Sequence, residues 1–367
     1  MGHIFLSFLF FNFIYIIFYQ HYKRGDYYIN KTNLVIYTLL LVAFGTYGGG
    51  EGDYVHYKER IEEFHSILDV LYAGGMEKQY YYLAYLVDGN YDLWRLVLFS
   101  IQFVGMSWLL YKAKLNTYPI LLCFIASSLV SSVYGRAYWG SIFYFLGTYL
   151  LIEKKNPLFL IIIALSYFSH TQNIVLLAML PLAFINIKKW HILLVIVLSG
   201  TLVTLLKDTF TNILNSGGIE GADYVNDRMQ KYSEGSLGNF GNSIGEYIMF
   251  VLHYVPIALV LLTYLKVLFK QRNKYLSFYK PYRGILNVAI GIVATSIIVL
   301  LAALGGGTFF YRILAMAGYP ITLLLPYMVE SNVIKKKTFN LYILFFFITT
   351  EISYFKDLYY AYMNGNF

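Results

Sequence analysis

The sequence has few charged residues and almost no cysteine, and each shortage excludes a class of protein. Only 13% of its 367 residues are Asp, Glu, Lys or Arg, whereas a soluble domain carries about 25%. Hydrophobic residues make up 58% and the mean hydropathy is +0.57, so a water-soluble globule is excluded. The single cysteine, Cys123, has no partner for an internal disulfide and cannot form a Cys-based metal cluster.

Several catalytic motifs and sequence signals are also missing. The chain has no H-E-x-x-H, no G-x-S-x-G and no D-x-D pair, so metalloprotease, hydrolase and nucleotide-sugar transferase functions lose their usual support. No repeat of fixed period occurs. The first apolar run has no small-residue cleavage site, so we interpret it as a retained helix and not as a signal peptide.

What the chain has instead is a series of twelve apolar segments. A membrane-spanning helix takes about 20 apolar residues, and the shorter segments depend on flanking aromatic and Lys residues to complete a crossing. We therefore expect an all-α polytopic membrane protein of about 12 transmembrane helices, folded as one integral-membrane domain over residues 1–367. The segments lie at residues 4–19, 34–48, 92–111, 118–133, 140–152, 157–168, 172–187, 191–206, 244–266, 284–304, 312–329 and 339–354.

The gaps between these segments alternate in charge. The odd-numbered gaps hold 18 of the 28 Lys and Arg residues but only 3 of the 20 Asp and Glu residues. Cytoplasmic loops carry the excess of Lys and Arg, so we place the odd gaps in the cytoplasm. Both chain ends and two long loops, at about 48–91 and 207–243, are then extracytoplasmic. In the first loop, apolar residues recur at helical spacing, which predicts a helix that begins at Gly52 and continues to Leu71. The second is rich in Gly, Ser and Asn, and we expect a loop with one helical turn near 224–231.

Arginine residues at the outer mouths of spans are the first candidates for chemistry. Arg136 lies in S-V-Y-G-R-A-Y-W-G, and Arg312 follows Tyr311 in G-G-G-T-F-F-Y-R-I. Arg suits a bidentate grip on phosphate oxygens, and it is costly at a helix end in the bilayer unless it has a partner. For Arg95 and Arg228, a functional role and a side chain that only extends to the membrane interface are equally good interpretations.

Two further side chains suggest acid–base chemistry. His170 interrupts an apolar stretch in S-Y-F-S-H-T-Q-N, where it would donate to phosphate, act as a base or form an interhelical hydrogen bond. Asp53 follows the glycine-rich G-G-G-E-G and suits a helix N-cap as well as a catalytic or sugar-binding role. The glycine run lacks the Lys-Ser/Thr of a phosphate-binding P-loop.

Other residues of the outer face are expected to contact substrate. The tyrosines suit stacking on sugar rings as well as a membrane-interface belt. The expected substrate-binding set is Glu51, Tyr54, Tyr57, Tyr134, Tyr138, Arg228 and Tyr311.

Three motifs of the outer face follow one another in a specific order. The first is G-D-Y-x-x-Y at residues 52–57, the second is the short turn with Arg136 before a helix that ends in E-K-K, and the third is the F-x-H turn at His170. This order resembles the EpsG-type branch of the Wzy polysaccharide polymerases, which join O-antigen or capsule repeat units. The resemblance covers about residues 34–187 together with the turn at Arg312.

The resemblance implies a glycosyltransferase of the bacterial inner membrane that joins oligosaccharides carried on undecaprenyl pyrophosphate. Arg136 and Arg312 would bind the pyrophosphate, His170 would donate to phosphate or act as the base, and Asp53 would position or deprotonate the acceptor hydroxyl. The donor is already activated, so we expect no cofactor and no metal. Membrane lipids, a chain-length regulator and a flippase are the further partners suggested, and nucleic acid is not.

Three alternative functions stay open at the sequence level. A lipid-linked oligosaccharide flippase handles the same substrate, but it would be expected to carry charge along a central cavity. An O-antigen ligase needs the same donor chemistry and a different acceptor. A membrane acyltransferase would need donor-handling His and Arg residues that are accessible from the cytoplasm.

Overall fold

The computed structural model is helical wherever it describes the chain, as the sequence predicts. The helices fall into two compact units, Met1–Leu177 with Thr322–Phe367 (unit 1) and Ala178–Ile321 (unit 2), and each unit is described by itself. No strand occurs within the described ranges. Those ranges are residues 2–48, 52–72, 78–115, 118–134, 140–170, 173–187, 190–191, 254–266, 280–301 and 313–363.

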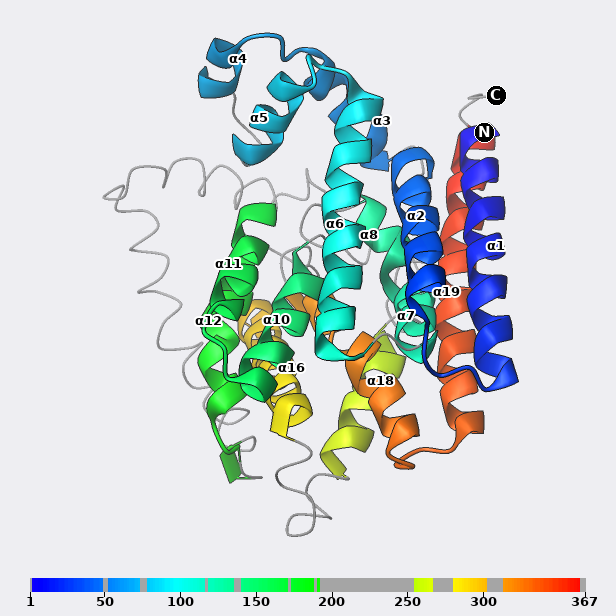
Figure 1. Ribbon diagram of the computed structural model, residues 1–367, viewed down its shortest axis with the longest axis vertical. Helices are drawn as coiled ribbons and strands as arrows, with labels where there is room; N and C mark the ends of the chain where they lie inside the picture. The colour runs from blue at the N-terminus through cyan, green and yellow to red at the C-terminus, as the bar shows by residue number, and fades with distance from the viewer. Residues whose placement is uncertain are drawn as a thin grey trace. The chain divides into compact units, whose positions relative to one another are not determined.

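Unit 1 contains the long helices at both ends of the chain (Figure 1). Its helices are α1 (Gly2–Arg24), α2 (Lys31–Tyr47), α3 (Gly52–Glu62), α4 (Ile67–Tyr72), α5 (Lys78–Leu86), α6 (Tyr91–Ala113), α7 (Tyr118–Phe124), the π-helical turn η1 (Ile125–Leu129), α8 (Val130–Tyr134), α10 (Ser141–Lys154), α11 (Phe159–Ser169) and α19 (Lys336–Met363). At the boundaries of the two units lie α12 (Ile174–Met179) and α18 (Ile321–Glu330).

Unit 2 is described at four helical stretches. These are the 3-10 helix η3 (Leu180–Phe184), the helix Tyr254–Lys266, α16 (Lys280–Leu301) and the helix that begins at Ile313. The Asn287 side chain of α16 donates to the carbonyls of Leu182 and Ile185, at 3.1 and 2.8 Å, and so ties α16 to the end of η3.

The apolar segments coincide with helices wherever their residues are described. Among the described residues, four helices are long and apolar enough to cross a membrane, namely His3–Arg24, Tyr91–Ala113, Ile313–Glu330 and Lys336–Tyr359. Of the segment at 191–206 only residue 191 is described, and the loop at 207–243 lies wholly outside the described residues. The count of twelve spans, the side on which the termini lie and the single domain stay predictions.

The turns of unit 1 that carry Lys and Arg lie together at one end of the unit, here called the basic end (Figure 1). The Tyr118 N–H, at the start of α7, donates to the Tyr27 carbonyl in the α1–α2 turn at 3.0 Å. Lys336 Nζ, from the turn before α19, lies 5.9 Å from the Tyr27 ring centroid. The ends of α6 and α10 also share a cavity lined by Lys112, Lys114 and Lys154, together with Tyr111, Asn156 and Phe159. The predicted in-phase alternation therefore agrees with the arrangement of unit 1.

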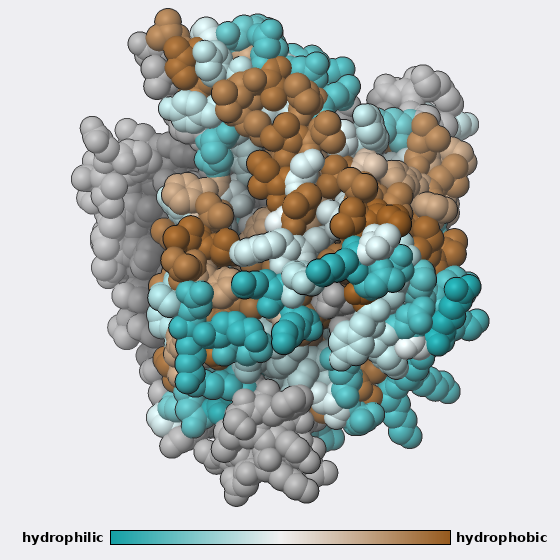
Figure 2. Space-filling view, viewed as in Figure 1, coloured by the Kyte–Doolittle hydropathy of each residue, from teal (hydrophilic) through white to brown (hydrophobic). Residues whose placement is uncertain are grey.

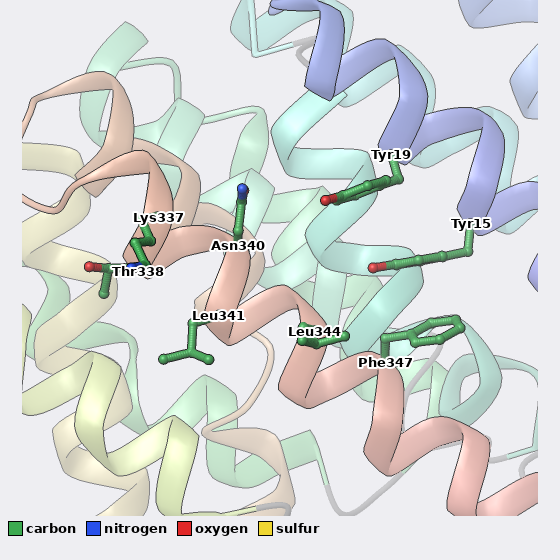
Figure 3. A pocket seen from close by; sticks show the side chains of 8 residues that line it. All are labelled: Tyr15, Tyr19, Lys337, Thr338, Asn340, Leu341, Leu344 and Phe347. Atoms are coloured by element: carbon green, nitrogen blue, oxygen red, sulfur yellow. The ribbon is translucent and has the colours of Figure 1, made fainter.

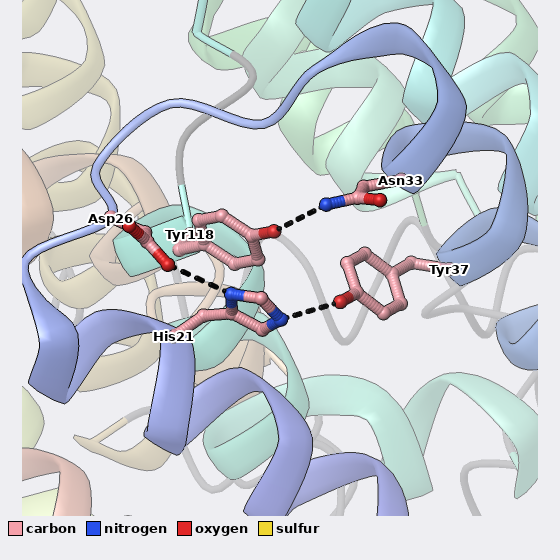
Figure 4. Close-up of polar contacts among 5 residues, drawn as sticks. All are labelled: His21, Asp26, Asn33, Tyr37 and Tyr118. Atoms are coloured by element: carbon pink, nitrogen blue, oxygen red, sulfur yellow. Dashed lines mark hydrogen bonds and ion pairs between the residues drawn. The ribbon is translucent and has the colours of Figure 1, made fainter.

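A histidine-centred cluster fixes this end (Figure 4). His21 Nδ1 lies 2.9 Å from Asp26 Oδ2, and its Nε2 lies 2.8 Å from the Tyr37 hydroxyl. The carboxylate can only accept, so Nδ1 donates to Asp26 and Nε2 accepts from Tyr37. The His21 ring stacks on Tyr118 at 4.5 Å, and Asn33 Nδ2 donates to the Tyr118 hydroxyl at 3.2 Å. The cluster joins α1, α2 and α7.

Apolar side chains cover much of the surface between the two ends of unit 1. In Figure 2, hydrophobic surface lies between the hydrophilic surface over α3 and α4 and a hydrophilic band toward the basic end. Exposed apolar residues recur along α6 and α19 at helical spacing, for example Ile101, Val104 and Trp108 on α6. Such surface suits contact with lipid chains rather than with water.

The first long loop, between α2 and α6, contains three short helices, α3 to α5. The predicted start at Gly52 is confirmed, but the prediction of one helix from Gly52 to Leu71 is wrong, because α3 ends at Glu62 and α4 begins at Ile67. Ser66 and Asp69 explain the break. The Ser66 N–H donates to Asp69 Oδ2 at 2.7 Å, and the Asp69 N–H donates to Ser66 Oγ at 3.2 Å. This reciprocal capping box starts a new helix, and the bonds from Ser66 hold the pKa of Asp69 below its ordinary value.

Candidate functional site

The predicted site residues divide into those that the structure describes and those that it does not. His170 and Tyr57 are described with their side chains, and both are half-buried. Asp53 and Tyr54 lie in the first turn of α3, and Tyr134 ends α8; their helical backbone is described. The remaining predicted residues lie outside the described part of the chain: Glu51, Arg136, Tyr138, Arg228, Tyr311 and Arg312.

The helix that leads toward Arg136, α8, meets the first long loop at one end of unit 1, here called the loop end. There α3, which carries Asp53 and Tyr57, packs against α6 and α8. Helix α8 ends two residues before Arg136, and α10 begins five residues after it, at Ser141. The chain that leads into Arg136 is therefore anchored next to the helix that carries Asp53.

Gly140 brings the start of α10 against the last turn of α11. A methyl group at Gly140 would lie 2.5 Å from Ser169 Oγ and 2.6 Å from the Ser166 Cα, so only glycine fits there. Small residues at 166 and 169, on one face of α11, allow this close approach in the way typical of membrane helices. As a result, the chain emerging from the Arg136 turn lies beside the turn that holds His170.

His170 occupies a turn held by its neighbours. It forms the C-cap of α11 in extended conformation; its N–H donates to the Tyr167 carbonyl at 3.1 Å, and its carbonyl accepts from the Asn173 N–H at 2.9 Å. The buried Asn173 side chain donates to the Ser166 carbonyl at 2.8 Å. Asn173 thus closes the turn around His170. Asn173 was not among the residues predicted from the sequence, although an Asn after the end of an apolar helix is a recognisable turn signal.

Tyr80 connects the first loop to the same turn. Its hydroxyl donates to the Ser169 carbonyl at 2.5 Å, and its own carbonyl accepts from Trp94 Nε1 at 3.0 Å. Both rings are buried, and they meet edge to face with centroids 6.1 Å apart. Tyr80 therefore serves the packing of α5 onto α6 and α11. Of the three consecutive tyrosines at 80–82, only Tyr82 is exposed enough to stack on a sugar ring.

Arg95 is buried and binds the end of α2. Its guanidinium donates to the carbonyls of Gly45 and Gly48, with Nη2 2.5 Å from each oxygen and Nε 3.1 Å from the Gly45 oxygen. The side chain is only 3% exposed, so it does not extend to the interface. By holding Gly48, Arg95 fixes the point from which the chain continues toward Asp53.

The loop end offers donors for an anion and a candidate base. His170 is the titratable side chain of the turn after α11. Arg60 lies in the last turn of α3, and its Nη1 donates to the Tyr81 hydroxyl at 3.5 Å. Helix α10 begins at the N-cap Gly140, which has no side chain to cap it. A helix N-terminus favours negative charge. Among the described residues, no three His, Cys, Asp or Glu side chains lie close enough together to hold a metal ion; the expectation of metal-independent chemistry stays a prediction.

Comparison with known proteins identifies the family. No curated protein and no solved structure matches the chain significantly. The sequence model of the EpsG family matches residues 32–366, which is nearly the whole chain. The match includes the loop, both turns and the helices that hold them. The apolar helices and this match together indicate a membrane protein of polysaccharide biosynthesis. The chain belongs to the EpsG family, the family of Wzy-type polysaccharide polymerases.

Proposed function

We propose that the protein polymerises oligosaccharide repeat units carried on undecaprenyl pyrophosphate, at the outer face of the bacterial cytoplasmic membrane. The observation that carries the proposal is the contact of Gly140 with Ser166 and Ser169, because it brings the chain next to Arg136 against the His170 turn. A cation for the leaving group and a candidate base then belong to one end of unit 1. The family supports the polymerase function, and the loop end supports the assignment of its chemistry.

The proposed reaction forms one glycosidic bond and breaks one glycosyl phosphate bond. An acceptor hydroxyl oxygen attacks the anomeric carbon of the donor, and the bond from that carbon to the pyrophosphate oxygen breaks. The proton of the hydroxyl passes to Asp53 or His170 as the base. The undecaprenyl pyrophosphate leaves with the bonding electron pair, so its charge increases as the bond breaks. Arg136 and Arg312 would stabilise that charge, with the start of α10 contributing its N-terminal dipole.

The remaining assignments follow from this reaction. Glu51, Tyr54, Tyr57, Tyr134, Tyr138, Arg228 and Tyr311 would hold the glycan chains. No nucleotide or metal is required, because the donor already carries its leaving group. A flippase would deliver the repeat unit, and a chain-length regulator would act on the product.

Reconstitution tests the proposal and separates it from its alternatives. The purified protein is given lipid-pyrophosphate repeat units alone in nanodiscs, and the products are resolved on a gel. A polymerase gives a ladder of multimers. A flippase or an acyltransferase gives none, and a ligase transfers only when a separate acceptor is added. Absence of a ladder from active, folded protein would overturn the proposed reaction.

Substitutions test the site in cells that lack the native gene. Arg136→Ala, Arg312→Ala, His170→Ala and Asp53→Asn are expected to abolish long polymer at normal protein abundance. Arg136→Lys is expected to fail as well, because Lys cannot supply the bidentate grip. Arg24→Ala is the matched control, since it removes an exposed Arg from the basic end. If all four variants still build long polymer, the site assignment is wrong.

A further inference from the structure

A groove between α1 and α19 has the features of a lipid-binding site (Figure 3). It encloses about 550 Å³, within the usual range for small-molecule sites. Polar side chains line one end and apolar side chains line the rest. The lining residues are Tyr15, Tyr19, Lys337, Thr338, Asn340, Leu341, Leu344 and Phe347.

The polar end of the groove lies at the start of α19, within the basic end of unit 1. Lys337 is exposed at the end of the run Lys335–Lys336–Lys337, and α1 contributes Lys23 and Arg24 from its last turn. Positive charge at this level of a membrane protein attracts anionic lipid headgroups. Charge complementarity therefore favours a ligand with a phosphate group.

Asn340 adds a second and independent observation. The side chain lines the groove one turn along α19 from Lys337, and its amide nitrogen points away from the helix (Figure 3), whereas its Oδ1 is buried. An amide N–H donates to a phosphate oxygen. Asn340 therefore offers the phosphate a second contact beside Lys337.

The apolar wall fits an acyl chain. Leu341, Leu344 and Phe347 succeed one another along α19, and Leu341 and Leu344 are exposed. Across the groove, Tyr15 stacks on Phe347 at 4.0 Å and on Tyr19 at 5.9 Å. The run from Thr338 to Phe347 covers about 14 Å at 1.5 Å per residue, which is close to the ~15 Å thickness of one leaflet.

We propose that this groove binds an anionic glycerophospholipid of the leaflet at the basic end. The phosphate lies against Lys337 and accepts from Asn340 Nδ2, and one acyl chain follows the wall from Leu341 to Phe347. The site is separate from the loop end and does not depend on the polymerase reaction.

The experiment uses the full-length protein, delipidated in a neutral detergent, and measures retained lipid by native mass spectrometry. Phosphatidylglycerol is compared with phosphatidylcholine, which has the same phosphate but no net charge. Wild-type protein is expected to prefer phosphatidylglycerol. Lys337→Gln should weaken phosphatidylglycerol binding about fivefold, the value of one Lys at an anionic surface. Asn340→Leu should weaken it about tenfold while the protein stays folded, because it removes a hydrogen-bond donor to the phosphate.

The matched control is Lys335→Gln, which removes the same charge two residues away and outside the groove lining. It should leave binding unchanged. Equal losses in Lys335→Gln and Lys337→Gln would mean general surface attraction and would overturn the site. Equal retention of phosphatidylcholine by wild-type protein would overturn it as well. If inorganic phosphate displaces the lipid at millimolar concentration, the groove binds free phosphate and the lipid assignment is wrong.

Discussion

Removing the Arg95 guanidinium should loosen the connection between α2 and α6 at the loop end. In Arg95→Met a similar apolar stem remains, but the carbonyls of Gly45 and Gly48 lose their donor in a buried site. A hydrogen bond to a charged group contributes about 1.5–3 kcal/mol, so the loss of both carbonyl contacts predicts about 3 kcal/mol. The contacts of the guanidinium with the Tyr91 and Phe99 rings, at 5.8 and 5.5 Å, add to this cost.

Thermal unfolding of the purified protein in detergent measures this effect. With an unfolding entropy of about 2.1 cal/mol/K per residue, 3 kcal/mol corresponds to a decrease in Tm of about 4 °C. Arg95→Lys should lie between wild type and Arg95→Met, because an ammonium keeps the charge and loses the planar fork. Lys112→Met, at an exposed position of the same helix, controls for the loss of charge alone. A Tm for Arg95→Met equal to that of Lys112→Met would refute the assignment of Arg95 as the residue that holds α2.

Three further predictions concern the loop end. Gly140→Ala should overpack the α10–α11 contact at a cost of about 1–3 kcal/mol, measured by thermal unfolding, and should reduce polymer length in cells; unchanged values would contradict the close approach. Tyr80→Phe removes the donor to the Ser169 carbonyl and should cost about 1 kcal/mol, with faster hydrogen exchange in α5. The lowered pKa of Asp69 means that its stabilisation of α4 is present above the unfolded pKa and is lost as pH falls through the folded pKa. The protection factors of the α4 amides, taken relative to the intrinsic exchange rate at each pH, should therefore fall on acidification in wild type and depend less on pH in Asp69→Asn.

Hydropathy and charge were sufficient to predict the helices and the common location of the basic turns. A membrane span must satisfy its own backbone hydrogen bonds, so an apolar run such as 92–111 has few alternatives to α6. The positions of Lys112 and Lys154 in separate turns predicted that those turns share one side, and both residues line one cavity. These features depend on local composition, which the sequence displays directly.

Features that depend on tertiary contacts were not predictable in the same way. The π-helical turn η1 inside the segment 118–133 frees the Ala126 carbonyl to accept from Thr350 of α19 at 3.0 Å, a partner more than 200 residues away. The partners of Arg95 are main-chain carbonyls, which no side-chain motif indicates. The break before α4 differs, because the S-x-x-D pattern of Ser66 and Asp69 is a local signal that could have been used.

Hydrogen bonds from side chains to main-chain carbonyls recur at the loop end and bear on the proposed chemistry. The C-terminal ends of α2 and α11 lie there, and free carbonyls at a helix C-terminus carry negative partial charge that would oppose a pyrophosphate. Arg95 donates to the end of α2, while Tyr80 and Asn173 donate to carbonyls of the last turn of α11. Because these residues donate to main-chain carbonyls, they reduce the negative potential there. The candidate catalytic side chains stay available for the substrate. Variants of Arg95 or Asn173 should therefore weaken polymerisation together with stability, whereas His170→Ala should impair polymerisation while the Tm stays near that of the wild type. A parallel loss of both properties in His170→Ala would mean that His170 belongs to the scaffold and not to the reaction.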